Sequence, residues 1–276
     1  MQISIVVPTR DRPEQLARCL AALGDEHEVV VVDDGSRDRA ALSRALDRHP
    51  ATRLVRAPGR GPATARNLGA RASSGEVVCF TDDDCVPEPG WAAALAEAAS
   101  AVGSAAGRTL APAGARPPVL ASQAIVEQLT FASLDPARDR LGFAPTCNLA
   151  VSRDALGSLP FDESFPRAAG EDRDWSDRAT AAGLAPVYAP AAVVVHHQRL
   201  GAAAFVRQQF AYGRGAARYR AADRGRRLAG PGFYAALMRR GFADGVGVGG
   251  LVLAAQVLTA AGVAAERLAG LGGRGG

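Results

Sequence analysis

Residues 75–85 read Gly-Glu-Val-Val-Cys-Phe-Thr-Asp-Asp-Asp-Cys, a short apolar run that ends in three consecutive aspartates. The apolar half is bounded by a glycine and is typical of a buried strand, so the aspartates would lie at its carboxyl end. Three adjacent carboxylates repel one another unless solvent or a multivalent cation surrounds them. Ligands of open α/β sheets bind just outside the carboxyl ends of the strands, which favours a cation over a solvated acidic turn.

The segments before residue 75 alternate between strand and helix patterns. Apolar, β-branched runs predict strands, and apolar residues at helical spacing predict helices. In chain order these are a strand over 2–8, a helix over 13–23, a strand over 28–32, a helix over 41–46, a strand over 53–55 and a helix over 62–72. This order predicts a parallel sheet with right-handed crossovers. The strands that precede Asp33 and Asp82 should then end at the same edge of the sheet.

The pattern is less regular after the aspartates. A helix is predicted over residues 91–100, whereas residues 101–118 are small and aperiodic and are expected to form a loop with one short strand near Thr109. The next expected elements are a helix over 122–134, an extended segment over 143–152, a helix over 170–183, and either a strand pair or a bent strand over 187–195, interrupted by Pro190. That strand leads directly into His196 and His197.

The composition indicates a globular protein with an uneven distribution of charge. Of its 276 residues, 48% are hydrophobic and 22% are charged, which suits one large domain or a domain with an appendage. All 32 basic residues are arginine, and ten of them lie in residues 199–240 against a single acid. The net charge is only +4, so the rest of the chain is acidic. We divide the chain into an α/β domain, residues 1–200, and a basic and apolar helical region, residues 201–276.

The cysteines and the N-terminal residues indicate in which cellular compartment the protein is expected. The four cysteines, Cys19, Cys79, Cys85 and Cys147, show no CxxC spacing and have no neighbouring histidine in the sequence. Their spacing predicts neither a zinc framework nor a disulfide set, which fits a reducing environment. The N-terminus starts with a strand pattern, without the features of a secretory signal. We therefore expect residues 1–200 in the cytoplasm.

The C-terminal region combines a basic helix with an uncharged segment. Residues 204–220 have a helical pattern with arginines on one side, and residues 246–265 carry no charge over about the length that spans a bilayer. Such a segment can span a membrane, lie in its interface or pack on another subunit. Arginines beside it favour the anionic, cytoplasmic face of a membrane, where a lipid-linked acceptor would be found. A solvated basic helix pair next to an ordinary packed helix is an equal alternative.

Three groups of residues carry candidate chemistry. Asp82 and Asp84 can both approach a divalent ion, and Mg²⁺ prefers one or two protein carboxylates. His196 or His197 can add an imidazole, which favours Mn²⁺, although a histidine at a strand end is more often structural. Arg66 follows a glycine-rich entry into a helix, where its guanidinium and the helix amides can hold a diphosphate.

An ordered set of motifs covers about residues 1–200. The motifs are Ile-Val-Val-Pro-Thr-Arg at 5–10, Val-Val-Asp-Asp-Gly-Ser at 31–36, Ala-Arg-Asn-Leu-Gly at 65–69, Phe-Thr-Asp-Asp-Asp at 80–84, Gly-Glu-Asp at 170–172 and the strand-borne His196. Each motif alone is a weak signal, but the set in this order resembles the family 2 inverting glycosyltransferases. The resemblance implies a GT-A (Rossmann-like) fold, with a mostly parallel central sheet flanked by helices.

The resemblance also implies a nucleotide site at the carboxyl ends of the first strands. The residues implied are Pro8, Thr9, Arg10, Asp33, Asp34, Arg66, Asp82 and Asp83. Thr9, Asp33 and Asp34 would line the base and the ribose. Arg66 would face the pyrophosphate.

A metal ion and a catalytic base are implied as well. Asp82 and Asp84 would form the DxD pair that binds Mn²⁺ or Mg²⁺, with Asp84 as the direct ligand. His196 would be a late metal or pyrophosphate contact. Asp172 would be the base, ahead of Glu171, and the amides of a helix N-terminus should keep Asp172 ionised. Acids at a helix start can also do no more than satisfy the helix dipole.

The implied function is transfer of a sugar, of the hexosyl type, from a nucleoside diphosphate sugar to a hydroxyl of a glycan or lipid-linked acceptor. A sugar-phosphate nucleotidyltransferase is the nearest alternative, but it should carry a glycine-rich basic loop after the first strand, and residues 9–13 contain no glycine. A non-catalytic sugar-nucleotide-binding module should have lost the base or the metal pair. Nucleic acid is not an expected partner, because the sheet edge is acidic. Within the aspartate triplet, Asp83 is expected to tolerate change.

Overall fold

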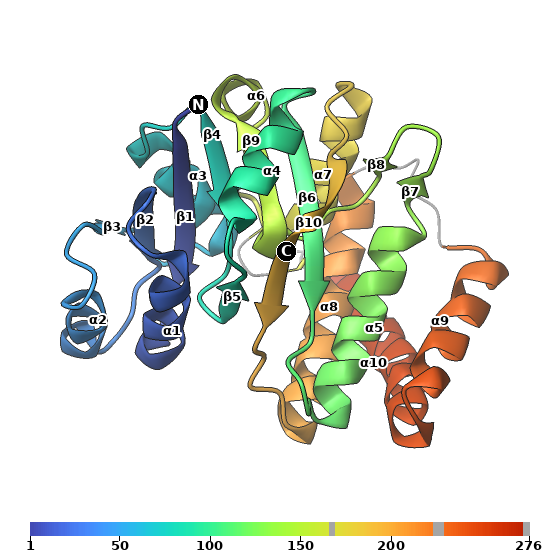
Figure 1. The fold of residues 1–276 in the computed structure, drawn as a ribbon. Coiled ribbons are helices and arrows are strands. Elements are labelled where there is room, and N and C mark those ends of the chain that lie inside the picture. The colour runs from blue at the N-terminus through green and yellow to red at the C-terminus, as the bar shows by residue number, and fades with distance from the viewer. Residues whose placement is uncertain (166–168, 223–228, 273–276) are drawn as a thin grey trace.

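The computed structural model describes residues 1–165, 169–222 and 229–272, and a mixed sheet forms its centre (Figure 1). Within those ranges ten strands pair in the order β3-β2-β1-β4-β9-β6-β10-β8-β7, with β5 on β10. They are β1 (Ile3–Thr9), β2 (Glu28–Asp33), β3 (Arg53–Arg56), β4 (Val77–Phe80), β5 (Cys85–Pro87), β6 (Ser104–Leu110), β7 (Leu134–Asp135), β8 (Arg140–Leu141), β9 (Leu149–Ser152) and β10 (Val187–His196). Strands β3, β2, β1 and β4 are parallel, as is β6 with β10, whereas β9 is antiparallel to both of its neighbours. The predicted α/β fold with a mostly parallel central sheet is confirmed.

Helices cover both faces of the sheet (Figure 1). They are α1 (Pro13–Leu23), α2 (Arg39–Leu46), α3 (Pro62–Ala72), α4 (Trp91–Ser100), α5 (Pro117–Phe131), α6 (Arg153–Ser158), α7 (Glu171–Ala181), α8 (Ala202–Ala222), α9 (Pro231–Ala243) and α10 (Val246–Gly272), with a 3-10 turn at Thr146–Asn148. Helices α1, α2 and α4 pack on one face around Leu16, Leu42 and Leu95. Helices α3, α6 and α7 pack on the other, where Phe161 and Trp175 are buried. Apolar strands thus lie between two helical layers, which explains their continuous hydrophobic runs.

Strand β6 includes Thr109, where one short strand is expected within a loop, but it is longer than that expectation. It lies in the middle of the sheet between β9 and β10. Its residues are small because its neighbours approach closely: a Cβ atom on Gly107 would lie 2.1 Å from the carbonyl oxygen of Ala192. The strand near Thr109 is found, but the loop expected before it is wrong over residues 104–108, because close packing rather than large apolar side chains stabilises this strand. The sequence patterns also miss β5, β7, β8, α6 and α9, and they start α5 five residues late.

Strand β10 is bent, as predicted. Its register against β6 shifts between Ala189 and Val193, on either side of Pro190, which cannot donate a ladder hydrogen bond. After the shift the strand continues to His196, which pairs with Cys85 of β5. The bend therefore delivers His196 to the edge where β4 ends.

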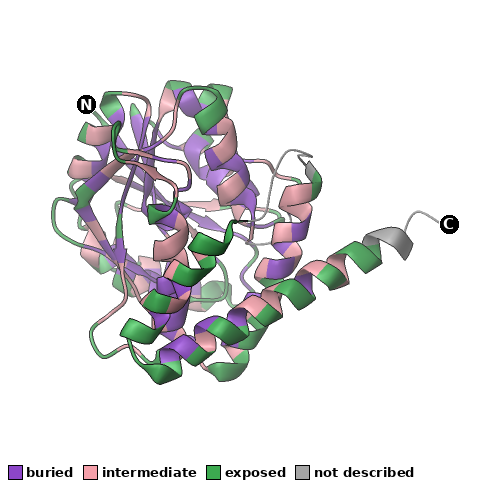
Figure 2. Ribbon diagram, turned by 90° about the vertical axis from the view of Figure 1, so that its right-hand side faces the viewer, coloured by how far each residue is buried: buried purple, intermediate pink, exposed green. Residues whose placement is uncertain are grey.

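The C-terminal helices share a core with α5. Helices α8, α9 and α10 pack with it around Phe205, Leu237, Val248 and Val252, so the division at residue 200 stays a prediction. From Val246 to Ala269 helix α10 is long and apolar enough to cross a membrane, a property that buried helices of soluble proteins share. Figure 2 shows that it runs along the side of the molecule and past its body, with much of its outer face exposed.

Helix α10 approaches α8 closely because two glycines face each other. A Cβ on Gly213 of α8 would lie 2.1 Å from the carbonyl oxygen of Thr259, and a Cβ on Gly262 of α10 would lie 2.1 Å from that of Phe210. Any side chain at either position would push the backbones apart. In the structure, α10 is therefore docked on its own chain, rather than separated from it.

We predict that Gly262→Ala destabilises the protein although alanine favours helices. The added methyl group must displace backbone, which should lower the free energy of unfolding by about 1–3 kcal/mol. Gly250→Ala is the matched control, because Gly250 lies in the same helix, is exposed and has open space beside it. The control should gain up to about 1 kcal/mol. Urea denaturation measures both, and equal shifts in the two variants would contradict the docking of α10.

Candidate active site

The carboxyl ends of β1, β2 and β4 meet at one edge of the sheet. Thr9, the last residue of β1, lies beside Asp33, the last residue of β2. The hydroxyl of Thr9 donates a hydrogen bond of 2.7 Å to Asp83, which follows β4. Five aspartates, Asp33, Asp34, Asp82, Asp83 and Asp84, thus gather on neighbouring strand ends. The edge is acidic because the parallel order places these loops together.

Asp84 lies between an imidazole and a guanidinium. The Nε2 atom of His196 is 3.0 Å from Oδ1 of Asp84, and Nη1 of Arg12 is 3.2 Å from Oδ2. Burial lowers the pKa of His196, but the hydrogen bond and charge of Asp84 outweigh it and raise that pKa to about 9. His197 contributes its backbone N–H to the Asp84 carbonyl oxygen. Of the two histidines, His196 is thus the one whose ring contacts the aspartate triplet.

Arg66 joins two acidic segments that are far apart in the chain. It extends from α3, is 4% exposed, and lies 3.0 Å from Asp82 and 3.2 Å from Glu171. Its guanidinium also lies over the ring of Phe161, 5.9 Å from the centroid. The pyrophosphate contact expected of Arg66 stays a prediction. In this structure its visible role is to hold the first turn of α7 next to the end of β4.

Glu171 and Asp172 open α7 and differ in their surroundings. Glu171 is buried, pairs with Arg66 and accepts the N–H of Ala169. Asp172 is half-buried, and its Oδ1 accepts the N–H of Arg173. Burial raises the pKa of both carboxyls. The N–H of Arg173 favours the ionised form of Asp172, as expected at a helix start, but burial outweighs it and raises the pKa. The role of Asp172 as the base stays a prediction.

The acids after β2 face the glycine-rich turn before α3. Asp33 accepts the N–H of Ser36 at 2.8 Å and pairs with Arg56. Asp34 accepts the N–H of Gly61 at 3.0 Å, and its buried Oδ1 has no hydrogen-bond partner among the described residues. The exposed Arg10 lies 3.9 Å from Asp34. Pro8 precedes these loops, in register with Val32.

Sequence reasoning missed several side chains that hold this edge together. Arg12 bonds both Asp83 and Asp84, at 3.1 and 3.2 Å, and Arg56 pairs with Asp33. The only available signal was their position, because each arginine lies within three residues of a strand end. Asp83 is buried with two partners, and burial raises its pKa to about 6. The expectation that Asp83 tolerates change does not fit these contacts.

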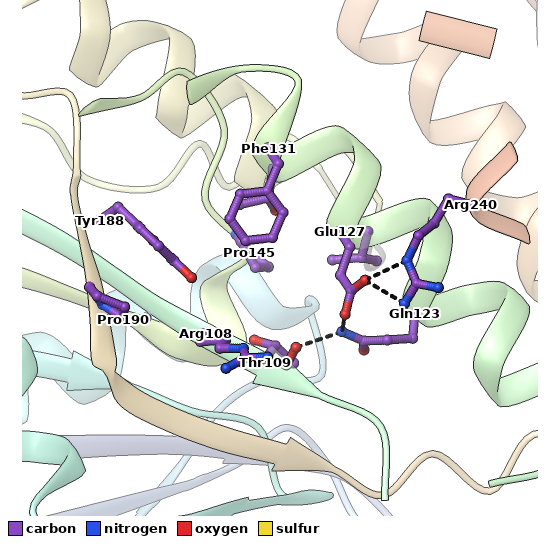
Figure 3. Close-up of a pocket in the computed structure, with 12 residues that line it drawn as sticks. Arg108, Thr109, Gln123, Glu127, Phe131, Pro145, Tyr188, Pro190 and Arg240 are labelled. Atoms are coloured by element: carbon purple, nitrogen blue, oxygen red, sulfur yellow. Dashed lines mark hydrogen bonds and ion pairs between the residues drawn. The ribbon is translucent and has the colours of Figure 1, made fainter. Parts of the chain in front are cut away.

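A separate cavity of about 320 Å³ lies between β6, β10, α5 and α9 (Figure 3). The ion pair of Glu127 with Arg240, at 3.1 Å, closes one side, and Phe131 packs edge-on to Tyr188 on another. None of the predicted site residues lines it. It approaches the acidic edge through Thr109, whose hydroxyl contacts Cys147.

We predict that Arg66→Ala strongly destabilises the protein. Removing the guanidinium leaves the carboxylates of Asp82 and Glu171 uncompensated, which should cost about 3–5 kcal/mol of unfolding free energy. Arg71→Ala is the control, since Arg71 lies on the same helix, is 60% exposed and is 3.9 Å from Glu163. The control should change stability by less than about 1 kcal/mol. Similar losses in both variants would show that Arg66 is not a structural link.

Curated relatives are similar to this sequence over most of its length. The chain is 29% identical over 225 residues to the pre-mycofactocin glycosyltransferase of Mycobacterium tuberculosis, covering 78% of this chain and 47% of that protein. It is 27% identical over 228 residues to glycosyltransferase AglE of Haloferax volcanii, covering 77% and 72%. The chain thus spans about half the length of the mycobacterial relative.

Solved structures of glycosyltransferases share the fold. Staphylococcus aureus TarS matches with a TM-score of 0.55 and 17% identity, over 89% of this chain and 44% of that one. Glucosyl-3-phosphoglycerate synthase of Mycobacterium tuberculosis, solved with Mn²⁺, uridine diphosphate and phosphoglyceric acid, matches with a TM-score of 0.56 and 20% identity, over 80% and 78%. The fold of this chain is therefore the GT-A fold.

The sequence also matches the model of a protein family. The glycosyl transferase family 2 model aligns with residues 4–157, more than half of the chain. That range includes the strand ends that carry Thr9, Asp33 and the aspartate triplet. The chain belongs to glycosyl transferase family 2.

Proposed function

We propose that this protein is a metal-dependent, inverting glycosyltransferase, and that it moves a sugar from a nucleoside diphosphate sugar to a hydroxyl of a glycan or lipid-linked acceptor. The observation that carries the proposal is the meeting of the aspartate triplet, His196 and the first turn of α7 around Arg12 and Arg66. A nucleotide site on β1 and β2, a cation site at β4 and a base on α7 would then lie side by side. We propose a cytoplasmic location for this reaction.

The donor groups at the end of β4 suit a hard divalent cation. Asp84 offers a carboxylate with an imidazole 3.0 Å away, and Asp82 is 30% exposed at its side chain. Carboxylates favour Mg²⁺ and Mn²⁺, and the imidazole favours Mn²⁺. We assign Asp82, Asp84 and His196 to hold the ion, which would stabilise the charge of the departing diphosphate. Arg12 supplies positive charge to Asp84 and to the neighbouring Asp83.

Asp172 is the proposed base. The acceptor oxygen attacks the anomeric carbon, the bond from that carbon to the diphosphate breaks, and the acceptor proton moves to the Asp172 carboxylate. Asp172 suits this step better than Glu171, because Arg66 and the N–H of Ala169 already hold the Glu171 carboxylate. Glu171 then acts as a positioning residue. A single displacement of this kind inverts the anomeric centre.

The donor site is proposed on β1, β2 and the loop before α3. Thr9, Asp33 and Asp34 would contact the base and ribose, with Pro8 and Arg10 beside them. Asp83 would act indirectly, because it anchors Thr9 and Arg12. Glucosyl-3-phosphoglycerate synthase was solved with Mn²⁺ and uridine diphosphate, and a TarS fragment was solved with UDP-GlcNAc. Uridine diphosphate sugars are therefore the first donors to test.

We predict that uridine diphosphate with Mn²⁺ raises the melting temperature of the full chain, and that Asp84→Asn abolishes the increase. A panel of UDP-, GDP- and dTDP-sugars, scored by thermal shift and by donor hydrolysis, extends the test. Asp25→Asn is the control, because Asp25 is exposed in the loop between α1 and β2. Unchanged stabilisation in Asp84→Asn, or none by any nucleotide sugar in the unaltered protein, would contradict the proposed site.

We further propose that the C-terminal helices hold the enzyme at an anionic membrane surface. The outer side of α10 exposes Leu253, Val257 and Leu268, at 55%, 66% and 69%. Val257 lies four positions after Leu253, and Leu268 lies eleven positions after Val257, so all three share one side of the helix. Because α10 is docked on α8, an in-plane contact fits the structure better than a spanning helix. The arginines of α8 and α9 would face the lipid phosphates.

We predict that the full chain co-sediments with phosphatidylglycerol vesicles and far less with phosphatidylcholine vesicles. The double variant Leu253→Gln, Val257→Gln should lose most of this binding without losing stability, because both side chains are exposed. Val206→Gln is the control, since Val206 is 47% exposed on α8. Equal binding of both variants, or no binding to anionic vesicles, would contradict the membrane contact.

A further inference from the structure

Two buried cysteines lie directly beside the ring of His196. The Sγ atoms of Cys85 and Cys147 and a ring nitrogen of His196 all lie within 4.8 Å of one another. The three residues come from β5, from the turn before β9 and from the end of β10. Both thiols are free. The spacing of these residues in the sequence predicts no zinc site, because they are far apart in the chain. Only the fold brings them together.

The donor set is soft, unlike the carboxylates next to it. Two thiolates and an imidazole are ligands that Zn²⁺ prefers, and three protein ligands with a water make a complete tetrahedral shell. At a Zn–S distance of about 2.3 Å, ligand atoms of such a shell lie about 3.5–3.8 Å apart. Atoms already within 4.8 Å need to move by about 1 Å to reach that spacing. The ordinary alternative is that the cysteines are small core residues.

Solvent comes close to the cysteine pair. Thr109 and Pro145 line the cavity of Figure 3, and the hydroxyl of Thr109 is 3.9 Å from the Sγ of Cys147. On the other side, the His196 side chain is 17% exposed. An ion therefore has two short approaches to the cluster. Cys19 and Cys79, in contrast, lie in α1 and β4, outside the cluster.

We propose that Cys85, Cys147 and His196 form a second, thiophilic metal site that binds Zn²⁺ and inhibits the enzyme. The inhibitory part rests on the proposed function. His196 contacts Asp84 at 3.0 Å and is also proposed to hold the catalytic cation. A neutral imidazole offers one nitrogen to a metal, so a zinc ion on His196 competes with the catalytic cation for this ligand. The two sites share His196 but favour different metals. The aspartates favour hard cations such as Mg²⁺ and Mn²⁺, and the cysteines favour softer cations such as Zn²⁺.

The test titrates Co²⁺, a spectroscopic substitute for Zn²⁺, into the full chain kept reduced with a phosphine. The unaltered protein should develop a thiolate-to-cobalt charge-transfer band in the near ultraviolet, and one equivalent of Zn²⁺ should remove it. Cys147→Ser should lose the band and bind Zn²⁺ at least about tenfold more weakly. Cys19→Ser, also a buried cysteine, should keep both properties. No band in the unaltered protein, or an unchanged band in Cys147→Ser, would overturn the site.

A second measurement needs no variant. Zinc X-ray absorption of the unaltered protein should find two sulfur ligands at about 2.3 Å and nitrogen or oxygen ligands at about 2.0–2.1 Å. A shell of nitrogen and oxygen ligands alone refutes the site.

A third measurement tests the inhibition. Zn²⁺ should block donor turnover in Cys19→Ser and spare it in Cys147→Ser. Sulfur ligation without inhibition refutes the inhibitory role, whereas failure of every sugar nucleotide to bind refutes the proposed function and leaves the spectra unaffected.

Discussion

Electrostatic repulsion among carboxylates at one sheet edge is the constraint on which the rest of the site depends. Parallel strands bring Asp33, Asp34 and the triplet 82–84 together, and α7 adds two more acids. Cationic side chains offset this charge. Arg12 pairs with Asp83 and Asp84, Arg66 lies between Asp82 and Glu171, His196 contacts Asp84, and Arg56 and Arg10 lie beside Asp33 and Asp34. The contact of Arg66 with Glu171 is the most buried of these, since both residues are almost fully removed from solvent, and loss of either partner would leave a buried charge unpaired. The same excess of negative charge is what makes the edge suitable for a cation and a diphosphate.

Much of the N-terminal half follows from the sequence. Apolar runs give β1, β2 and β4, helical spacing gives α1 and α3, and the alternation gives a parallel sheet whose acids converge. What sequence could not supply is contact between distant segments. Arg66 lies 105 positions from Glu171, and Asp84 lies far from His196, so neither ion pair has a local signal. The partners of Asp83 are equally remote, which is why the sequence contains no indication of its contacts with Thr9 and Arg12.

Close packing of small residues explains the other departures. β6 lies at the centre of the sheet although its segment has little apolar pattern, because Gly107 allows β10 and Asn148 to approach. The same principle operates at Gly213 and Gly262, where α8 and α10 nearly touch. Hydrophobic periodicity detects segments that bury large apolar side chains. It does not detect segments that pack closely because their residues are small. The small-residue strand and the close helix pair support β10 and α8, whose positions bring His196 and the C-terminal helices next to the acidic edge.

The central claim is that the acidic edge is a metal-nucleotide site, and a crystal grown with Mn²⁺ and uridine diphosphate tests it most directly. Anomalous scattering of manganese should give one strong peak in contact with the Asp84 carboxylate, with the diphosphate beside it and the base toward Thr9 and Asp33. Arg12 should no longer bond both aspartates. A manganese peak away from the triplet, or a nucleotide bound elsewhere on the protein, would contradict the account.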